Sequence, residues 1–122
     1  MSEQSETKYS MIVTIVSKGY ADITFAAAKE AGARFCTMLY ARGSGVHETE
    51  KFLNISIEPE KEIILTFVST GIVKEVVSAI TDKVGLATAG AGVTFVLPIT
   101  RTAGIPAEAP AAASPEDQGQ AR

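Results

Sequence analysis

Apolar residues occupy both parities of the strand-like segments in this chain, and this pattern limits how it can fold. In segment 11–16 every position except Thr14 is apolar, and segment 63–68 and segment 92–99 are also apolar at both parities. A sheet with one face in water alternates apolar and polar residues. These strands therefore predict a sheet that is covered on both of its faces.

The order of the segments predicts the topology. β-branched runs indicate strands, helical spacing of apolar residues indicates helices, and Gly32 and Gly85 stand where each helix ends. Ser69 or Thr70 is expected to cap the second helix. The order β-α-β-β-α-β and the handedness of crossovers predict an α+β, ferredoxin-like fold: a four-stranded antiparallel sheet with two helices on one face. The expected strands are 9–16, 34–41, 62–68 and 92–99, and the expected helices are 19–31 and 70–84.

Composition divides the chain into three parts. Residues 1–8 are polar and are predicted to be a flexible N-terminus. Residues 9–102 form the predicted domain, and residues 42–58, rich in Gly, Ser, Asn and charge, are expected to leave it as an excursion. Residues 103–122 are an Ala- and Pro-rich segment that cannot bury a face, which predicts a flexible tail.

Two short helices cover only one face of such a sheet, and the polar tail cannot cover the other. We therefore expect a second copy of the chain to cover it, because each buried Val, Ile or Leu contributes roughly 1.5–3 kcal/mol before the cost of association. A monomer with an apolar patch and a complex with a different partner are the alternatives.

Composition also excludes several classes of function. The net charge is −3 and no basic stripe is present, so nucleic acid is not an expected partner. Cys36 is the only cysteine, which excludes an internal disulfide and a cysteine zinc cluster. The chain has a single histidine and no tryptophan, and this small supply of catalytic side chains argues against an enzyme. The polar N-terminus and the short apolar runs predict a cytoplasmic protein.

A glycine pair gives the most specific motif. Gly90-Ala91-Gly92 leads directly into an apolar strand that stops at Pro98, and an amphipathic helix over 72–80 precedes it. Together with the order of elements, these features resemble the PII family of nitrogen regulatory signalling proteins over residues 9–102. The resemblance implies a homotrimer whose sheets face inward. It also implies adenine nucleotide clefts between subunits and a loop, here 43–58, that contacts a target protein.

The resemblance assigns five residues to the phosphate part of such a nucleotide site. Successive backbone N–H groups at glycines form an anion-binding concavity, and arginine adds forked, charge-assisted hydrogen bonds. The alternatives are a tight helix–strand connection for the glycines and solvated surface charges for the arginines. The assigned residues are Arg42, Gly43, Gly90, Gly92 and Arg101, and no metal ligand is assigned.

The chain departs from the family pattern at three places. The family usually has lysine directly after the second glycine and two basic residues past the last strand, whereas this chain has Val93 and Arg101 alone there. Loop 43–58 lacks the modifiable tyrosine. The implied effector is therefore an adenine nucleotide (AMP, ADP, ATP or a cyclic nucleotide) or a related small anion, and the implied target is a membrane transporter or a metabolic enzyme.

A second interpretation keeps the fold and changes the function. A trimeric, metal-responsive or structural protein of the CutA type would use Cys36, His47 and the loop carboxylates Glu48 and Glu50, with the glycines serving structure alone. The acidic run from Glu58 to Glu62 is expected to keep the entry of a strand soluble rather than to bind metal.

Overall fold

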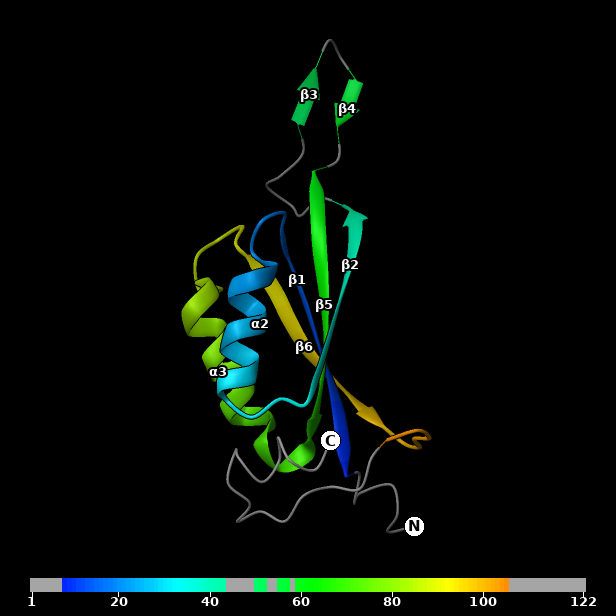
Figure 1. The fold of residues 1–122 in the computed structure, drawn as a ribbon. Coiled ribbons are helices and arrows are strands. Elements are labelled where there is room, and N and C mark those ends of the chain that lie inside the picture. Colours follow the sequence, from blue (N-terminus) through cyan, green and yellow to red (C-terminus); the bar gives the residue numbers. More distant parts are fainter. Residues whose placement is uncertain (1–7, 44–49, 53–54, 58, 106–122) are drawn as a thin grey trace.

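One antiparallel sheet organises the molecule, in a computed structural model that describes residues 8–43, 50–52, 55–57 and 59–105 (Figure 1). Its strand order is β2-β5-β1-β6, so the two strands that are central in the sheet are the first and third of the predicted four. This is the ferredoxin-like arrangement that the sequence predicts. The strands are β1 (Tyr9–Ser17), β2 (Phe35–Arg42), β5 (Glu60–Ser69) and β6 (Gly92–Ile99).

Both helices, α2 (Ala21–Glu30) and α3 (Val73–Val84), lie on the same side of this sheet (Figure 1). Gly85 takes a left-handed conformation, with φ +83°, directly after α3, as predicted for a C-terminal cap. The expected cap at the start of the second helix is wrong. A 3-10 turn (Thr70–Ile72) precedes α3, Ser69 makes no side-chain cap, and the Thr70 hydroxyl lies 2.9 Å from that of Ser10.

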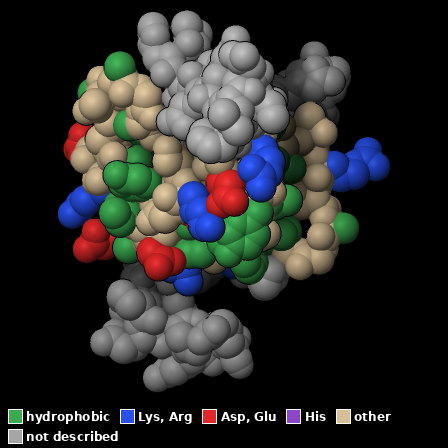
Figure 2. Space-filling view, turned by 90° about the horizontal axis from the view of Figure 1, so that it is seen from above, with side chains coloured by type: hydrophobic (Ala, Val, Ile, Leu, Met, Phe, Trp, Pro, Cys, Tyr) green, Lys and Arg blue, Asp and Glu red, His purple; other side chains and the backbone are tan. Residues whose placement is uncertain are grey.

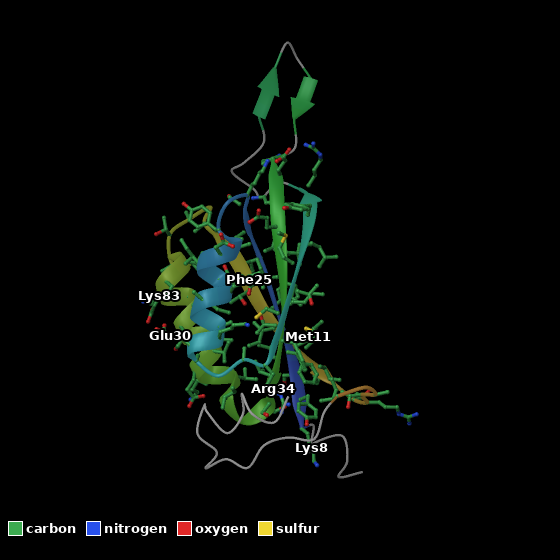
Figure 3. The ribbon with its side chains drawn as sticks, viewed as in Figure 1. Lys8, Met11, Phe25, Glu30, Arg34 and Lys83 are labelled. Carbon is green, nitrogen blue, oxygen red and sulfur yellow. The ribbon has the colours of Figure 1, made fainter. Side chains whose placement is uncertain are left out.

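The core fills the space between the helices and the sheet. Aliphatic side chains of β1, β5 and α3 are fully buried there, and Phe25 of α2 packs against them (Figure 3). Thr14, Thr66 and Thr94 also face the helices. The Thr14 and Thr94 hydroxyls lie 3.0 Å apart, so each has a hydrogen-bond partner in the core. The largest of the fully buried aliphatic residues are Ile12, Val16, Ile64, Val68, Val76 and Ile80.

The opposite side of the sheet, here called the open face, is apolar along the middle of its strands apart from Thr37. No described helix or strand covers it, and Met11 of β1 lies on that side (Figures 1 and 3). Its outer strands are exposed: Leu39 of β2 keeps 44% of its surface and Leu97 of β6 keeps 49%. Along the middle of the strands, the register places on this face Met11, Val13, Ile15, Phe35, Thr37, Leu39, Ile63, Leu65, Phe67, Val93, Phe95 and Leu97. Ser17, Lys61 and Ser69 lie on the same face at the strand ends.

Residues 50–57 lie within the excursion that the sequence predicts and contain strands that it does not. The structure describes two short antiparallel strands, β3 (Glu50–Phe52) and β4 (Ile55–Ile57), which stand beyond the end of the main sheet (Figure 1). Alternating isoleucines at 55 and 57 favour a strand, and the polar residues around them obscure that signal. The predicted flexible termini fall mostly on 1–7 and 106–122, outside the described residues, and stay predictions.

Candidate functional site

Four strand ends meet at the end of the sheet from which residues 43–58 depart. Because neighbouring strands are antiparallel, β2 and β1 finish at this end, and β5 and β6 begin there. Arg42 pairs with Glu60 across β2 and β5, and Gly92 pairs with Val16 across β6 and β1. The topology therefore brings four of the five predicted site residues to one end of the sheet.

Arg42, Glu60 and Lys18 form a charged row at this end, here called the loop-base cluster. Glu60 Oε1 lies 2.9 Å from Lys18 Nζ, and Glu60 Oε2 lies 3.6 Å from Arg42 Nη2. The backbone supports the same row, because the Lys18 N–H donates to the Glu60 carbonyl (3.3 Å) and the Gly43 N–H donates to that of Pro59 (3.2 Å). Glu60 of β5 thus links the end of β2 to the turn that follows β1.

The ion pairs shift the ionisation of this cluster. The hydrogen bond from Lys18, and then its charge, hold the pKa of the Glu60 carboxyl below its usual range. The same hydrogen bond from Lys18 to Glu60 raises the pKa of the Lys18 amine. Both groups are exposed, so each contributes little to global stability and remains accessible to a ligand.

A cavity of about 380 Å³ opens beside this cluster. Figure 2 looks onto this end of the molecule and shows basic and acidic side chains gathered beside a hydrophobic area. The exposed ring of Tyr40, with 75% of its surface accessible, contributes apolar area to the rim. Basic groups beside an aromatic ring suit a ligand that carries both an anionic and a planar part. The lining residues are Lys18, Tyr40, Ala41, Arg42, Glu60 and Lys61.

The two glycines of the pair have different surroundings. Gly92 has φ +145°, and a Cβ there would lie 2.5 Å from the Ile15 carbonyl oxygen, so β6 requires glycine for its close approach to β1. Gly90 has φ +83°, and no described atom lies within 4 Å of a Cβ built there. Gly92 therefore has a packing role, whereas the space beside Gly90 is open to a ligand.

The structure does not bring Arg101 to the other four predicted site residues. Arg101 follows Ile99, which pairs with Tyr9 at the opposite end of the sheet. Seven residue steps of β6 at about 3.3 Å each separate Gly92 from Ile99, which gives roughly 23 Å. Arg42 and Gly92 are themselves three strand spacings apart, or about 14 Å. One chain alone therefore offers no single pocket that contains all five residues.

Lys18 belongs to no motif in the sequence, and Glu62 has a different role from the one its acidic surroundings predict. Lys18 reaches the loop base from the β1–α2 turn, and the antiparallel pairing of β1 with β5 is the signal that could have located it. Glu62 is buried rather than at a soluble strand entry: its Oε1 accepts the backbone N–H groups of Gly19 (3.1 Å) and Ala21 (3.0 Å). A carboxylate from β5 therefore satisfies the N-terminus of α2.

The residues of the metal-responsive alternative are not assembled by the described part of the chain. His47 and Glu48 lie outside the described residues, and within the described ranges no three His, Cys, Asp or Glu side chains form a metal-binding group. Cys36 lies on the helix side of β2, 3.9 Å from the Thr66 hydroxyl, and burial raises the pKa of its thiol. A protonated, half-buried thiol is a poor nucleophile.

Comparison with known proteins places these features in one family. The family model described as nitrogen regulatory protein P-II matches residues 9–108. A search of curated proteins finds no match. No helix in the described ranges has the length and hydrophobicity needed to cross a bilayer.

Two solved structures share the fold. Arabidopsis thaliana PII bound to citrate superposes with a TM-score of 0.60 and 22% identity, over 78% of this chain and 80% of that one. The B. subtilis GlnK–ATP complex gives a TM-score of 0.60 and 18% identity, over 77% of this chain and 84% of that one. The family match spans most of the sequence, and the topology agrees with it. The chain belongs to the nitrogen regulatory protein P-II family.

Proposed function

We propose that this chain is a cytoplasmic, trimeric signalling protein of the P-II type. It binds an adenine nucleotide, or a related small anion, in clefts between subunits. Arg42, Gly43, Gly90, Gly92 and Arg101 contribute to the phosphate part of each cleft. Binding changes the shape of loop 43–58 and thereby its fit to a target, a membrane transporter or a metabolic enzyme.

The open face supports the trimer. Leu39, Phe95 and Leu97 expose large apolar side chains in one chain, and the described helices all lie on the other face. A continuous apolar surface of this kind marks an interaction site. Three copies that turn their open faces inward would bury it.

The position of Arg101 is the single observation that carries the inter-subunit site. Four assigned residues share one end of the sheet, and Arg101 follows a strand that ends at the other. A second copy packed against the open face could bring its Arg101 to the glycines and Arg42 of the first. The site is then complete only in the assembly.

The ligands of the structural neighbours support an anionic effector. The Arabidopsis protein was solved with citrate and the B. subtilis protein with ATP, both of which are multiply charged anions. In this chain the cavity beside Arg42 offers basic groups and an aromatic rim. This chain has Val93 where the family usually supplies a lysine, so one phosphate-binding cation of the family pattern is absent.

Calorimetric titration of AMP, ADP, ATP and cyclic AMP tests the nucleotide assignment. We expect at least one of them to bind, and Arg101→Gln to weaken that binding by about 1.5–3 kcal/mol if the guanidinium is hydrogen-bonded to phosphate. Lys83→Gln, on the outer side of α3 (Figure 3), removes the same charge as a control and should leave affinity unchanged. No binding of any of the four at millimolar concentration contradicts the nucleotide assignment.

Mixing two defective variants tests whether the site spans subunits. Arg42→Gln and Arg101→Gln should each bind nucleotide weakly as pure assemblies. After the two are denatured together and refolded, some clefts combine an intact Arg42 with an intact Arg101 from the neighbouring subunit, and a fraction of tight binding should return. If mixing restores nothing while sedimentation shows mixed assemblies, the two arginines do not share a cleft.

A further inference from the structure

The carboxylate of Glu60 occupies the position beside Arg42 that the proposed function assigns to a ligand anion. Its two oxygens divide between two cations: Oε1 lies 2.9 Å from Lys18 and Oε2 lies 3.6 Å from Arg42. The contact with Lys18 is a short charge-assisted hydrogen bond, whereas the contact with Arg42 is longer and weaker. Glu60 can therefore release Arg42 and still remain paired with Lys18.

The same contact closes the base of loop 43–58. Arg42 is the last residue of β2 and Glu60 is the first of β5, so their pairing joins the two points at which the loop enters and leaves the sheet. The Gly43 N–H bond to the Pro59 carbonyl lies directly beyond it. The state of one ion pair is thus linked to the pairing of the two strand ends from which the loop departs.

We infer that Glu60 is an internal competitor for Arg42, which an anionic ligand must displace, and that this exchange loosens the base of loop 43–58. The inference rests on the proposed function for the identity of the ligand. A phosphate or carboxylate placed at Arg42 is repelled by the nearby Glu60 carboxylate until Glu60 moves toward Lys18. Ligand binding and the closed loop base therefore oppose each other.

This arrangement gives the ligand different affinities for two states of the loop base. A ligand shifts a conformational equilibrium only if it binds the two states differently. The closed state has Arg42 paired with Glu60, and the open state has Arg42 available to the ligand. The exchange supplies the required difference through the described residues at the loop base.

Glu60→Gln tests the competition, because the amide keeps the size of the side chain and removes its charge. We expect it to tighten the binding of pyrophosphate and of ATP about two- to fivefold, the range that corresponds to one exposed ion pair. Glu75→Gln, an exposed glutamate on α3, is the control for net charge and should change neither affinity. An effect of Glu60→Gln no larger than that of Glu75→Gln overturns the inference.

A double variant identifies Arg42 as the group for which Glu60 competes. In an Arg42→Gln background, Glu60→Gln should no longer tighten binding, because the contested cation is absent. A gain of the same size in that background would show that Glu60 acts through general repulsion, and would overturn the inference.

Hydrogen exchange of the Gly43 amide reports the loop base directly. It should be faster in Glu60→Gln than in the wild type, and pyrophosphate should accelerate it in the wild type. Protection that stays unchanged in both cases contradicts the coupling.

The two ligands separate this inference from the proposed function. If pyrophosphate shows the Glu60 effect and ATP binds no variant, the competition stands and the nucleotide assignment fails. If ATP binds the wild type and Glu60→Gln changes nothing, the nucleotide assignment stands and the competition fails. If neither ligand binds any variant, both fail.

Discussion

At the scale of single residues, the two glycines before β6 can be separated experimentally. Gly92→Ala and Gly90→Ala each force alanine into a positive φ, and Gly92→Ala also places a methyl group against the Ile15 carbonyl. We expect Gly92→Ala to destabilise the fold by roughly 2–4 kcal/mol and Gly90→Ala by about 1 kcal/mol. Urea unfolding measures both. Equal losses would mean that the close approach of β6 to β1 adds nothing beyond the cost of the backbone conformation.

The ionisation of Glu60 gives a prediction in pH. Its carboxyl has a lowered pKa in the folded chain, so the ion pair is present above the ordinary value of 4.5 and is lost as pH falls through the lowered folded value. Lys18 has a raised pKa, so its contribution is complete below 10.5 and is lost only as pH rises through the raised folded value. The pair therefore persists between these limits.

Carbon-detected NMR titration of the Glu60 carboxyl checks this assignment. The midpoint should lie below the ordinary glutamate value in the wild type and should rise in Lys18→Met, because the first cause of the shift is the hydrogen bond from Lys18. The free energy of unfolding should change little, since both side chains are exposed. A midpoint that is identical in the two proteins would show that the pair does not form in solution.

At the scale of elements, the N-terminus of α2 depends on a residue of β5. Tyr20, at the N-cap position, provides no side-chain cap, and Glu62 accepts two backbone N–H groups there instead. Glu62→Ala leaves these donors unsatisfied in a buried place and should cost about 1–3 kcal/mol. Glu62→Gln retains an oxygen acceptor and should cost less. Chemical denaturation compares them, and equal losses would assign the effect to charge alone.

The sequence determined most of the helices and strands, but not all of them. The strands and helices followed from β-branched runs and helical spacing, and Gly85 ends α3 as expected. The start of α3 and the small sheet of β3 and β4 did not follow from such patterns. Thr70 has a partner in Ser10, sixty residues away in sequence, and a three-residue strand has too few positions to show a period.

At the scale of the whole molecule, the open face is expected to hold subunits together. Leu39→Asp or Phe95→Asp would place an unpaired carboxylate inside the interface, which costs several kcal/mol, on the order of 3 or more. Sedimentation velocity should then show single subunits. Ile23→Asp, at an exposed position of α2, is the control and should leave association intact. A wild-type chain that sediments as one subunit at micromolar concentration would contradict the proposed assembly.

The candidate site shows where sequence reasoning reached its limit. The resemblance assigned Arg42, Gly43, Gly90, Gly92 and Arg101 to one site, and the antiparallel topology brings the first four to one end of the sheet. Lys18 and the role of Glu60 were missed, because Lys18 belongs to no motif and Glu60 lies in an acidic run that predicts only solubility. They become neighbours only when β1 pairs with β5, forty-two residues apart in sequence, as the Lys18 and Glu60 backbone hydrogen bond shows.

The sequence by itself determined the element order, the sheet with two apolar faces and the family, because local propensity and periodicity are written in neighbouring residues. Only the tertiary structure decided which face stays open, that Glu60 pairs with Arg42, and that Arg101 lies at the other end of β6. These facts depend on the register between strands, which brings distant residues together through hydrogen bonds that no local pattern records.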